Sequence, residues 1–279
     1  MRIIESNGVR LATESFGTPD KGTILLVMGA TASMLWWPVS FCQALAAAGY
    51  QVIRFDHRET GESTASQPGQ IGYDVTEMAD DLIAILDAYG AAKAHLVGMS
   101  LGGLLSQILA LTHPDRVETL TLIAAEPLGM SYPSEGMSEQ FMAHFGTMGT
   151  LDWSDRTAVA AFLLRIAELS AGSAPPFDAD AAGARIAAEI DRAPDMQTAF
   201  NHALLTGTVD PALTAAGIAQ PVLIIHGTAD PLIAFTAAET LAEAIPDSDL
   251  LALDGRGHEL PPQDLERIAA AILSFLAGS

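Results

Sequence analysis

Short, almost continuous runs of apolar residues recur along the chain, separated by stretches in which apolar residues return at helical spacing. Runs of this kind predict strands that are buried on both faces of a parallel sheet. They occupy residues 23–28, 51–55, 94–97, 117–124, 221–226 and 249–253. Helical spacing predicts helices over residues 41–48, 74–89, 101–112, 234–244 and 264–276. We therefore expect an α/β fold with a mostly parallel sheet and helices on both faces.

The N-terminal residues follow a different pattern. Apolar and polar residues alternate near Ile3 and over residues 9–16, on either side of Asn7-Gly8. This pattern predicts an antiparallel hairpin closed by a tight turn. The same alternation lacks the apolar run of a signal peptide, which argues against secretion. The chain also has no window of about 18 consecutive apolar residues, so we expect no membrane span.

The strand-helix alternation stops near Pro127 and resumes after Pro211. The residues between them contain helical segments and Gly or Pro breaks, but no strand-like run. We expect residues 127–211 to be a helical cap inserted into a single core built from 1–126 and 212–279. No catalytic motif lies in this region, so it is expected to set substrate choice.

The segment from Gly98 to Gly102 fits the pattern G-x-S-x-G, with Ser100 at its centre. It stands between a predicted strand and a predicted helix, which is where a nucleophile elbow belongs. The glycines allow a tight turn, and the start of the helix offers a positive dipole end to an oxyanion. Ser100 is therefore the predicted nucleophile.

A serine hydroxyl needs a base, and in this arrangement the base follows the last strand. His258 stands there, in Gly255-Arg256-Gly257-His258. Four other histidines fall on predicted strands or helices and are expected to be structural: His95, His113, His144 and His202. His57 and His226 end strands near the presumed active edge, where a supporting or pocket role is open.

A carboxylate should orient that histidine. Asp230 follows the predicted strand 221–226 and gives the chain order serine, aspartate, histidine that such folds use. Glu126 also follows a predicted strand and is the alternative. We favour Asp230.

An ester carbonyl that becomes tetrahedral needs two N–H donors for its oxygen. The backbone N–H groups of Leu101 and Ala30 are the predicted pair, with Gly29 as the fallback for Ala30. Other residues of the loop after strand 23–28 are candidates to line the substrate pocket, although packing explains the tryptophans equally well: Met28, Gly29, Trp36 and Trp37.

Composition narrows the function classes. The 279 residues contain one cysteine, Cys42, which excludes an intrachain disulfide and any thiolate metal cluster, so no metal or cofactor is expected. A reducing cytoplasm is the expected location. The formal charge of −21, from 34 acidic and 13 basic residues, disfavours nucleic-acid binding. A small-molecule partner is expected, and the sequence does not indicate an oligomeric state.

With these motifs placed, the chain resembles the α/β-hydrolase superfamily over nearly its whole length. The likeness rests on Val27-Met28-Gly29, on residues 55–64 (FDHRETGEST), on Gly98 to Gly102 and on Gly257-His258. Within the superfamily the chain is most similar to the aclacinomycin methylesterase family, which cleaves a methyl ester on an anthracycline polyketide. Met28 stands where many relatives have a histidine. The resemblance does not extend to residues 127–211, so the substrate does not carry over.

These observations predict a serine hydrolase that cleaves a carboxylic ester, such as a methyl ester of a polyketide-like or other apolar substrate, through an acyl-enzyme. A cofactor-free perhydrolase or a carbon-carbon bond hydrolase would use the same three residues and remains the alternative. Haloalkane dehalogenases and epoxide hydrolases are disfavoured, because they place an aspartate where this chain has Ser100. A ligand receptor without turnover is the remaining class.

Overall fold

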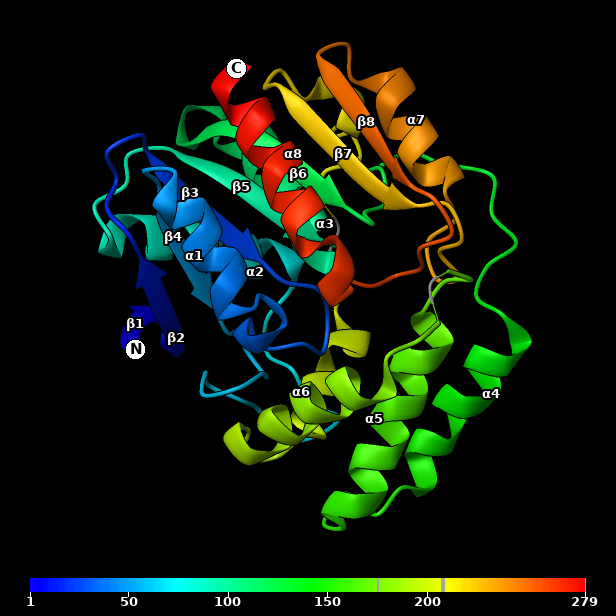
Figure 1. Cartoon of the computed structure of the whole chain (residues 1–279). Coiled ribbons are helices and arrows are strands. Elements are labelled where there is room, and N and C mark those ends of the chain that lie inside the picture. The colour runs from blue at the N-terminus through cyan, green and yellow to red at the C-terminus, as the bar shows by residue number, and fades with distance from the viewer. Residues whose placement is uncertain (175, 207–208, 279) are drawn as a thin grey trace.

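The computed structural model describes residues 1–174, 176–206 and 209–278; residues 175, 207 and 208 of the predicted cap and 279 of the predicted core lie outside the described residues. Within them, an eight-stranded sheet has the order β1-β2-β4-β3-β5-β6-β7-β8 (Figure 1). The strands are β1 (Arg2–Ser6), β2 (Val9–Phe16), β3 (Thr23–Val27), β4 (Gln51–Phe55), β5 (Ala94–Met99), β6 (Val117–Ile123), β7 (Val222–Gly227) and β8 (Ser248–Leu253). Strand β2 is antiparallel to β1 and β4, and the other pairs are parallel. The predicted α/β fold is confirmed.

The predicted hairpin is also present. Strands β1 and β2 pair from Arg2 with Thr13 to Ser6 with Val9. The two turn residues, Asn7 and Gly8, have φ values of 45° and 83°. Positive φ at both central positions is what the tightest hairpin turns require, and asparagine and glycine tolerate it best.

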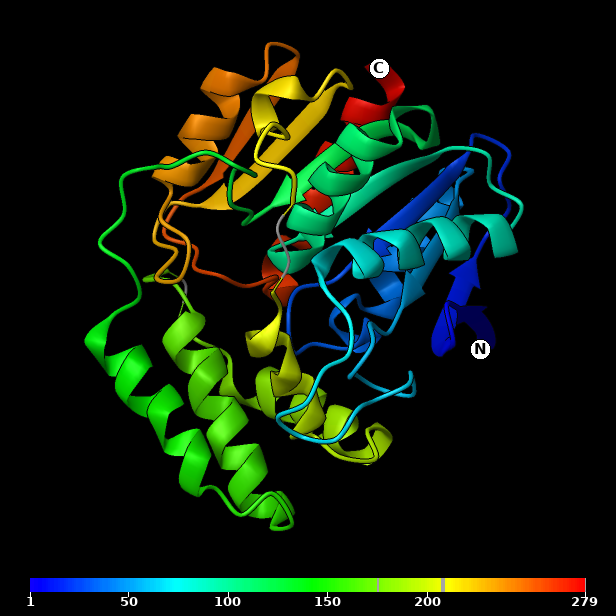
Figure 2. The same cartoon turned by 180° about the vertical axis from the view of Figure 1, so that it is seen from behind.

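Helices cover both faces of the sheet (Figures 1 and 2). On one face, α1 (Val39–Ala47) and α8 (Leu265–Gly278) bury Leu45 and Ile272 against the strands. On the other face lie α2 (Val75–Ala88), α3 (Leu101–Thr112) and α7 (Thr236–Ala244), whose apolar side chains form a second buried cluster. The sheet is therefore enclosed, as its apolar strands require.

Local sequence explains where α2 begins. The Asp74 side chain accepts hydrogen bonds from the N–H groups of Thr76 and Glu77, and the Glu77 carboxylate accepts the N–H of Asp74 in return. This capping box satisfies N–H groups that the helix cannot bond itself. Met78, Leu82 and other apolar residues at helical spacing then turn one side of α2 toward the sheet.

Between β6 and β7 the chain leaves the sheet and forms a helical insertion. It contains α4 (Glu139–Gly146), α5 (Arg156–Ser170) and α6 (Ala179–Arg192), with the 3-10 turns η3 (Thr147–Thr150), η4 (Thr198–Leu204) and η5 (Ala215–Gly217). Its described residues form no strand. Figure 1 places the three helices together at one end of the sheet, apart from the helices on its faces. The remaining 3-10 turns are η1 (Met34–Trp36), η2 (Pro114–Arg116) and η6 (Pro262–Asp264).

The insertion has a small aromatic core of its own. The rings of Trp153 and Phe200 lie 5.3 Å apart, and Phe162 lies 6.0 Å from each. Contacts of this kind add to the burial of aromatic area and hold α5 against η4. The insertion can therefore present side chains and backbone groups to the sheet in fixed positions.

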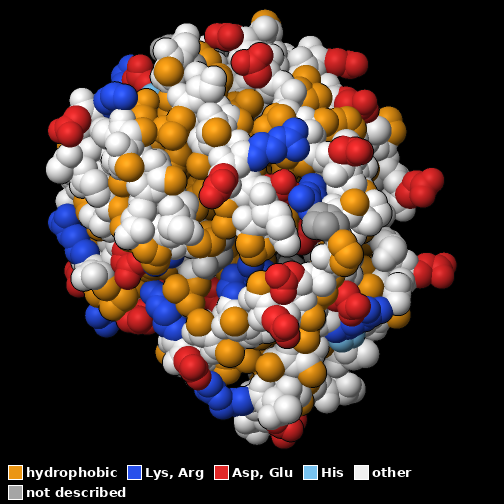
Figure 3. Space-filling model, in the orientation of Figure 1, with side chains coloured by type: hydrophobic (Ala, Val, Ile, Leu, Met, Phe, Trp, Pro, Cys, Tyr) orange, Lys and Arg blue, Asp and Glu red, His pale blue; other side chains and the backbone are white. Residues whose placement is uncertain are grey.

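Acidic side chains are spread over the surface. On the face in Figure 3 they project from both the sheet layers and the insertion, interspersed with basic and apolar groups. No helix among the described residues combines the length and the continuous apolar sequence that crossing a bilayer requires.

Candidate functional site

Ser100 lies where β5 turns sharply into α3. Its φ of 51° and ψ of −117° are rare for a residue other than glycine, and the strain they imply is typical of functional sites. The N–H of Ser100 donates to the oxygen of Ile123 at 2.9 Å, which ties the turn to the end of β6. Serine in this position commonly caps its helix, but among the described residues the Ser100 side chain does not cap α3.

The glycines beside Ser100 have a steric reason. A Cβ atom on Gly102 would lie 2.0 Å from the oxygen of Val27, and one on Gly98 would lie 2.4 Å from the oxygen of Gly102. Any side chain at these positions would push α3 away from β3 and β5. The turn therefore needs the glycines that the motif contains.

Asp230 and His258 are in direct contact. Nδ1 of His258 lies 2.8 Å from Oδ2 of Asp230. The other oxygen, Oδ1, accepts the N–H groups of Leu232 at 2.8 Å and Ile233 at 2.9 Å. The Asp230 side chain is fully buried, and that of His258 is 11% exposed. A carboxylate held in this way keeps the imidazole in one orientation, and among the described residues Nε2 of His258 has no hydrogen-bond partner.

The charge of Asp230 is stabilised despite its burial. Burial alone would raise the pKa of this carboxyl group. Interactions with His226 and His258 and the N–H of Ile233 outweigh burial and hold the pKa well below its usual range. Asp230 is therefore ionised at neutral pH and can stabilise a cationic His258.

His226 approaches the same carboxylate oxygen of Asp230 that His258 contacts. Its Nε2 lies 2.9 Å from the oxygen of Ile233 and 3.4 Å from Oδ2 of Asp230. Because a carbonyl oxygen accepts, Nε2 carries the proton, and Nδ1 is buried without a partner among the described residues. His226 thus supports the loop of Asp230, a role the sequence left open.

The alternative acid, Glu126, is exposed and bonds elsewhere. Its Oε1 accepts a hydrogen bond from the Tyr132 hydroxyl at 2.5 Å. Burial, and then this carboxylate, raise the pKa of Tyr132 above its ordinary value. Of the two candidate acids, Asp230 is the one that contacts His258.

The loop after β3 passes beside the serine. A Cβ atom on Gly29 would lie 3.3 Å from Cβ of Ser100 and 3.9 Å from its Oγ. Ala30 is exposed, and Thr31 has a φ of 65°. Leu101 is the first residue of α3. The loop that contains Ala30 and the start of α3 therefore meet beside the serine.

Three apolar residues of this loop have separate places. Met28 is 2% exposed and Trp37 is fully buried, stacked on Phe41, so both belong to the core under α1. Trp36 is half-buried, and the guanidinium carbon of Arg185 lies 3.7 Å from its ring centre. Packing, which the sequence left open for the tryptophans, accounts for Trp37, and a cation-π contact with the insertion accounts for Trp36.

The histidines expected to be structural bond to nearby groups. Nδ1 of His95 lies 3.0 Å from the Thr119 hydroxyl, and Nδ1 of His113 lies 3.0 Å from the Thr112 hydroxyl. Nε2 of His144 lies 3.0 Å from the oxygen of Phe162 within the insertion. His202 instead bonds the N–H of Thr31 and the oxygen of Arg58.

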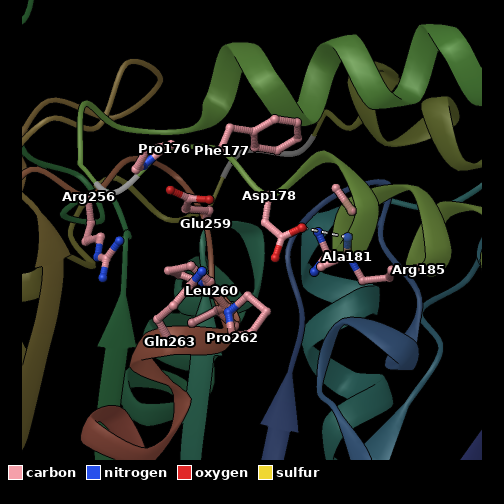
Figure 4. Close-up of a pocket in the computed structure, with 12 residues that line it drawn as sticks. Pro176, Phe177, Asp178, Ala181, Arg185, Arg256, Glu259, Leu260, Pro262 and Gln263 are labelled. Atoms are coloured by element: carbon pink, nitrogen blue, oxygen red, sulfur yellow. Dashed lines mark hydrogen bonds between the residues drawn. The ribbon is translucent and has the colours of Figure 1, made fainter.

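Two cavities adjoin the site. One, of about 350 Å³, lies beside α3 and the segment after β6, and is lined by Leu104, Glu126, Pro127, Leu128, Gly129, Met130, Ser131 and Tyr132. Leu104 lies one helical turn from the serine, because its N–H donates to the oxygen of Ser100. The other, of about 30 Å³, lies where the insertion meets residues 256–263 (Figure 4). There Arg185 of α6 and Arg256 face the same space as Glu259.

The insertion holds the loop of His258 by its backbone. The N–H of His258 donates to the oxygen of Ser170 at 2.8 Å, and the N–H of Gly172 donates to Oε1 of Glu259 at 3.3 Å. The approach is close, since a Cβ atom on Gly172 would lie 2.1 Å from the oxygen of Gly255. The sequence placed no catalytic motif in residues 127–211, but these residues hold the loop that carries the predicted base.

Sequence reasoning did not single out Ser170 or Gly172, because small residues at a helix end carry no local signal for a contact so distant in the chain. Among the described residues, no group of three or more His, Cys, Asp or Glu side chains is arranged to hold a metal ion.

The chain is similar to known proteins over nearly its whole length. Residues 22–264 match the family described as "alpha/beta hydrolase fold". The chain is 32% identical over 286 residues to rhodomycin D methylesterase DauP of Streptomyces sp. (strain C5), covering 97% of this chain and 96% of that protein. It is 30% identical to epoxide hydrolase A of Mycobacterium tuberculosis, covering 99% of this chain and 97% of that protein.

Among solved structures, the esterase EaEST from Exiguobacterium antarcticum superposes with a TM-score of 0.80. The alignment covers 99% of this chain and 98% of that one at 21% sequence identity. At that identity the match supports the arrangement of strands and helices.

Proposed function

Because the chain belongs to the alpha/beta hydrolase fold family, we propose that it is a serine hydrolase that cleaves a carboxylic ester through an acyl-enzyme. Ser100 is the nucleophile, His258 the general base and Asp230 the acid that orients it. The observation that supports this most is the 2.8 Å contact of Asp230 with His258, which leaves Nε2 of the histidine free. The rhodomycin D methylesterase homologue supports ester hydrolysis as the reaction class.

In the first half of the reaction, Oγ of Ser100 attacks the ester carbon while His258 takes the hydroxyl proton on Nε2. The cation on His258 is stabilised by the ionised Asp230. The tetrahedral intermediate collapses, the bond to the alcohol oxygen breaks, and His258 returns its proton to the departing alcohol. Water then attacks the acyl-enzyme with the same base and releases the acid and Ser100.

A tetrahedral intermediate forms in each half of the reaction, and its negative oxygen accepts hydrogen bonds from the backbone N–H groups of Ala30 and Leu101. Gly29 lies beside Ser100, and Leu101 begins the helix behind it. The positive end of the α3 dipole adds to this stabilisation.

The proposed substrate is a small-molecule ester with a large apolar part, such as a methyl ester of a polyketide-like compound. One relative is named rhodomycin D methylesterase, and the cavity beside Leu104 has a volume of about 350 Å³ and is lined mostly by apolar residues. We propose that residues 127–211 form the cap that selects the substrate over a core of 1–126 and 212–279. A cytoplasmic location remains our proposal, from the single cysteine.

The test is fluorophosphonate labelling of Ser100 and turnover of a panel of aryl and methyl esters. Ser100→Ala should abolish labelling and lower turnover by as much as about a millionfold. A folded Ser100→Ala protein with near wild-type esterase activity would refute the assignment of Ser100 as the nucleophile. If Ser100 is labelled but the protein forms a peracid or cleaves a carbon-carbon bond faster than it hydrolyses esters, the result would favour a perhydrolase or a carbon-carbon bond hydrolase. No turnover at all would favour a ligand receptor.

A further inference from the structure

The backbone of residues 28–31, here called the oxyanion loop, is held at both ends by a histidine ring. At its start, Nε2 of His57 lies 2.8 Å from the oxygen of Met28. At its end, Nδ1 of His202 accepts the N–H of Thr31 at 3.0 Å. His57 follows β4, whereas His202 belongs to η4 of the insertion. The predicted donor, Ala30, lies between the two held positions.

The partners of His202 fix its tautomer. Thr31 offers an N–H, so Nδ1 must carry a lone pair; Nε2 lies 2.8 Å from the oxygen of Arg58, which can only accept, so Nε2 must carry the proton. A ring that is neutral and protonated on Nε2 satisfies both contacts. A doubly protonated ring would set Nδ1–H against the N–H of Thr31.

The surroundings favour this neutral form. His202 is 5% exposed, and its ring lies edge-on to that of His57 with the centres 6.1 Å apart. Burial, and then the neighbouring His57, lower the pKa of His202 to about 4, against smaller opposing effects of the Arg58 carbonyl and the Glu59 carboxylate. Burial likewise lowers the pKa of His57 to about 4. Both rings are therefore neutral at physiological pH.

Thr31 needs an external hold. Its φ of 65° is a left-handed conformation that a β-branched residue rarely adopts. Strain of this kind persists only where the surroundings impose it. The bond to His202 is a contact that would be lost if Thr31 relaxed, and relaxation would reorient the preceding peptide groups, including the N–H of Ala30.

We propose that His202 is a positioning residue for the oxyanion hole: through Thr31 it holds the loop that presents the N–H of Ala30 to the developing oxyanion. The inference rests on the proposed function, because it gives that loop its role. It also means that the helical insertion supplies part of the support on which the chemistry depends.

Two substitutions of His202 separate its two hydrogen bonds. In His202→Asn the amide oxygen takes approximately the place of Nδ1 and can accept the N–H of Thr31, whereas in His202→Gln the amide reaches the place of Nε2 and keeps the contact to Arg58. His202→Gln should lower kcat on a short-chain aryl ester about a hundredfold, near the cost of losing one oxyanion donor, with KM within about threefold. His202→Asn should recover most of that loss.

His144→Gln is the matched control, since His144 lies in the same insertion, and its ring bonds the oxygen of Phe162 through Nε2 and stacks on the Phe162 ring. It should leave kcat unchanged. A second measurement, ¹⁵N NMR of the imidazole in the wild-type protein, should find His202 protonated on Nε2 alone at neutral pH, and does not depend on how the variants fold.

The outcomes are distinguishable. A wild-type protein with neither ester turnover nor Ser100 labelling refutes the proposed function. An active wild-type protein overturns this inference alone if His202→Gln matches it in kcat, if His202→Asn and His202→Gln lose activity equally while folded, or if the ring is protonated on Nδ1.

Discussion

Replacing Asp230 by asparagine keeps the shape of the side chain and should reverse its effect on His258. Oδ1 of Asp230 accepts two backbone N–H groups, from Leu232 and Ile233. The single oxygen of an asparagine would stay with those two donors, because turning the amide would set its NH₂ group against them. The NH₂ group would then face Nδ1 of His258.

An NH₂ group can only donate, so Nδ1 would have to carry a lone pair and the proton of His258 would move to Nε2. That is the atom that must take the proton of Ser100. The wrong tautomer lowers turnover by about ten-thousandfold in a related arrangement, or about 5 kcal/mol of transition-state stabilisation. Glu126→Gln should change turnover less than about threefold, because Glu126 is exposed and a glutamine oxygen can still accept from Tyr132.

The assay compares the turnover numbers of Asp230→Asn, Glu126→Gln and the wild-type protein on a short-chain aryl ester at neutral pH. Circular dichroism and thermal melting establish that each variant is folded. If Glu126→Gln loses its turnover and Asp230→Asn stays active, the acid that orients His258 is misassigned. The hydrogen bond between Asp230 and His258 would then serve folding instead. Two fully active variants would refute the need for any such acid.

The remaining predictions concern stability and the contact between the insertion and the histidine loop. The pKa values of His57 and His202 are about 4 in the folded state and about 6.5 in the unfolded state, so the unfolded chain binds more protons between these values. The free energy of unfolding should therefore fall as pH decreases from 6.5 to 4, by up to about 3 kcal/mol for each histidine, and a flat urea-denaturation profile across this range would contradict their burial as neutral rings. Gly172→Ala should lower kcat at least about tenfold, because its Cβ atom would lie 2.1 Å from the oxygen of Gly255 and would displace the loop of His258. Gly183→Ala, at a helical position with no atom within 4 Å of the added Cβ, should instead stabilise the protein by about 1 kcal/mol at unchanged kcat, and equal kcat in both variants would argue against the contact.

The sequence predicts the sheet, its covering helices and the positions of Ser100 and His258, because each has a local signal. Ser100 has flanking glycines between an apolar strand and a helix, and His258 follows the last strand on a glycine-rich loop. Asp230 and Glu126 share their local pattern. They differ in where their loops lead, since Asp230 turns inward to bond the N–H of Ile233 and Glu126 remains in solvent.

Other features depend on contacts that no local pattern reports. Met28 and Trp37 were predicted as candidates for a pocket, and both lie in the core, because an apolar side chain suits either place. Thr31 and His202 are separated by 171 positions in the chain, and their hydrogen bond follows from how the insertion folds back. His202 was expected to be structural from its helical setting alone.

Several hydrogen bonds join the insertion to the loops around the proposed site, among them those of Ser170 with His258, Gly172 with Glu259 and His202 with Thr31. Chimeras that exchange residues 127–211 between relatives would therefore change rate and selectivity together. A change in selectivity could then not be attributed to the exchanged segment alone. A remodelled insertion in this chain must keep these hydrogen bonds if the loops that they hold are to stay in place. Substitutions confined to the wall of the larger cavity, such as those at Leu104 and Met130, leave these hydrogen bonds unchanged. They are the more direct way to alter the proposed substrate range.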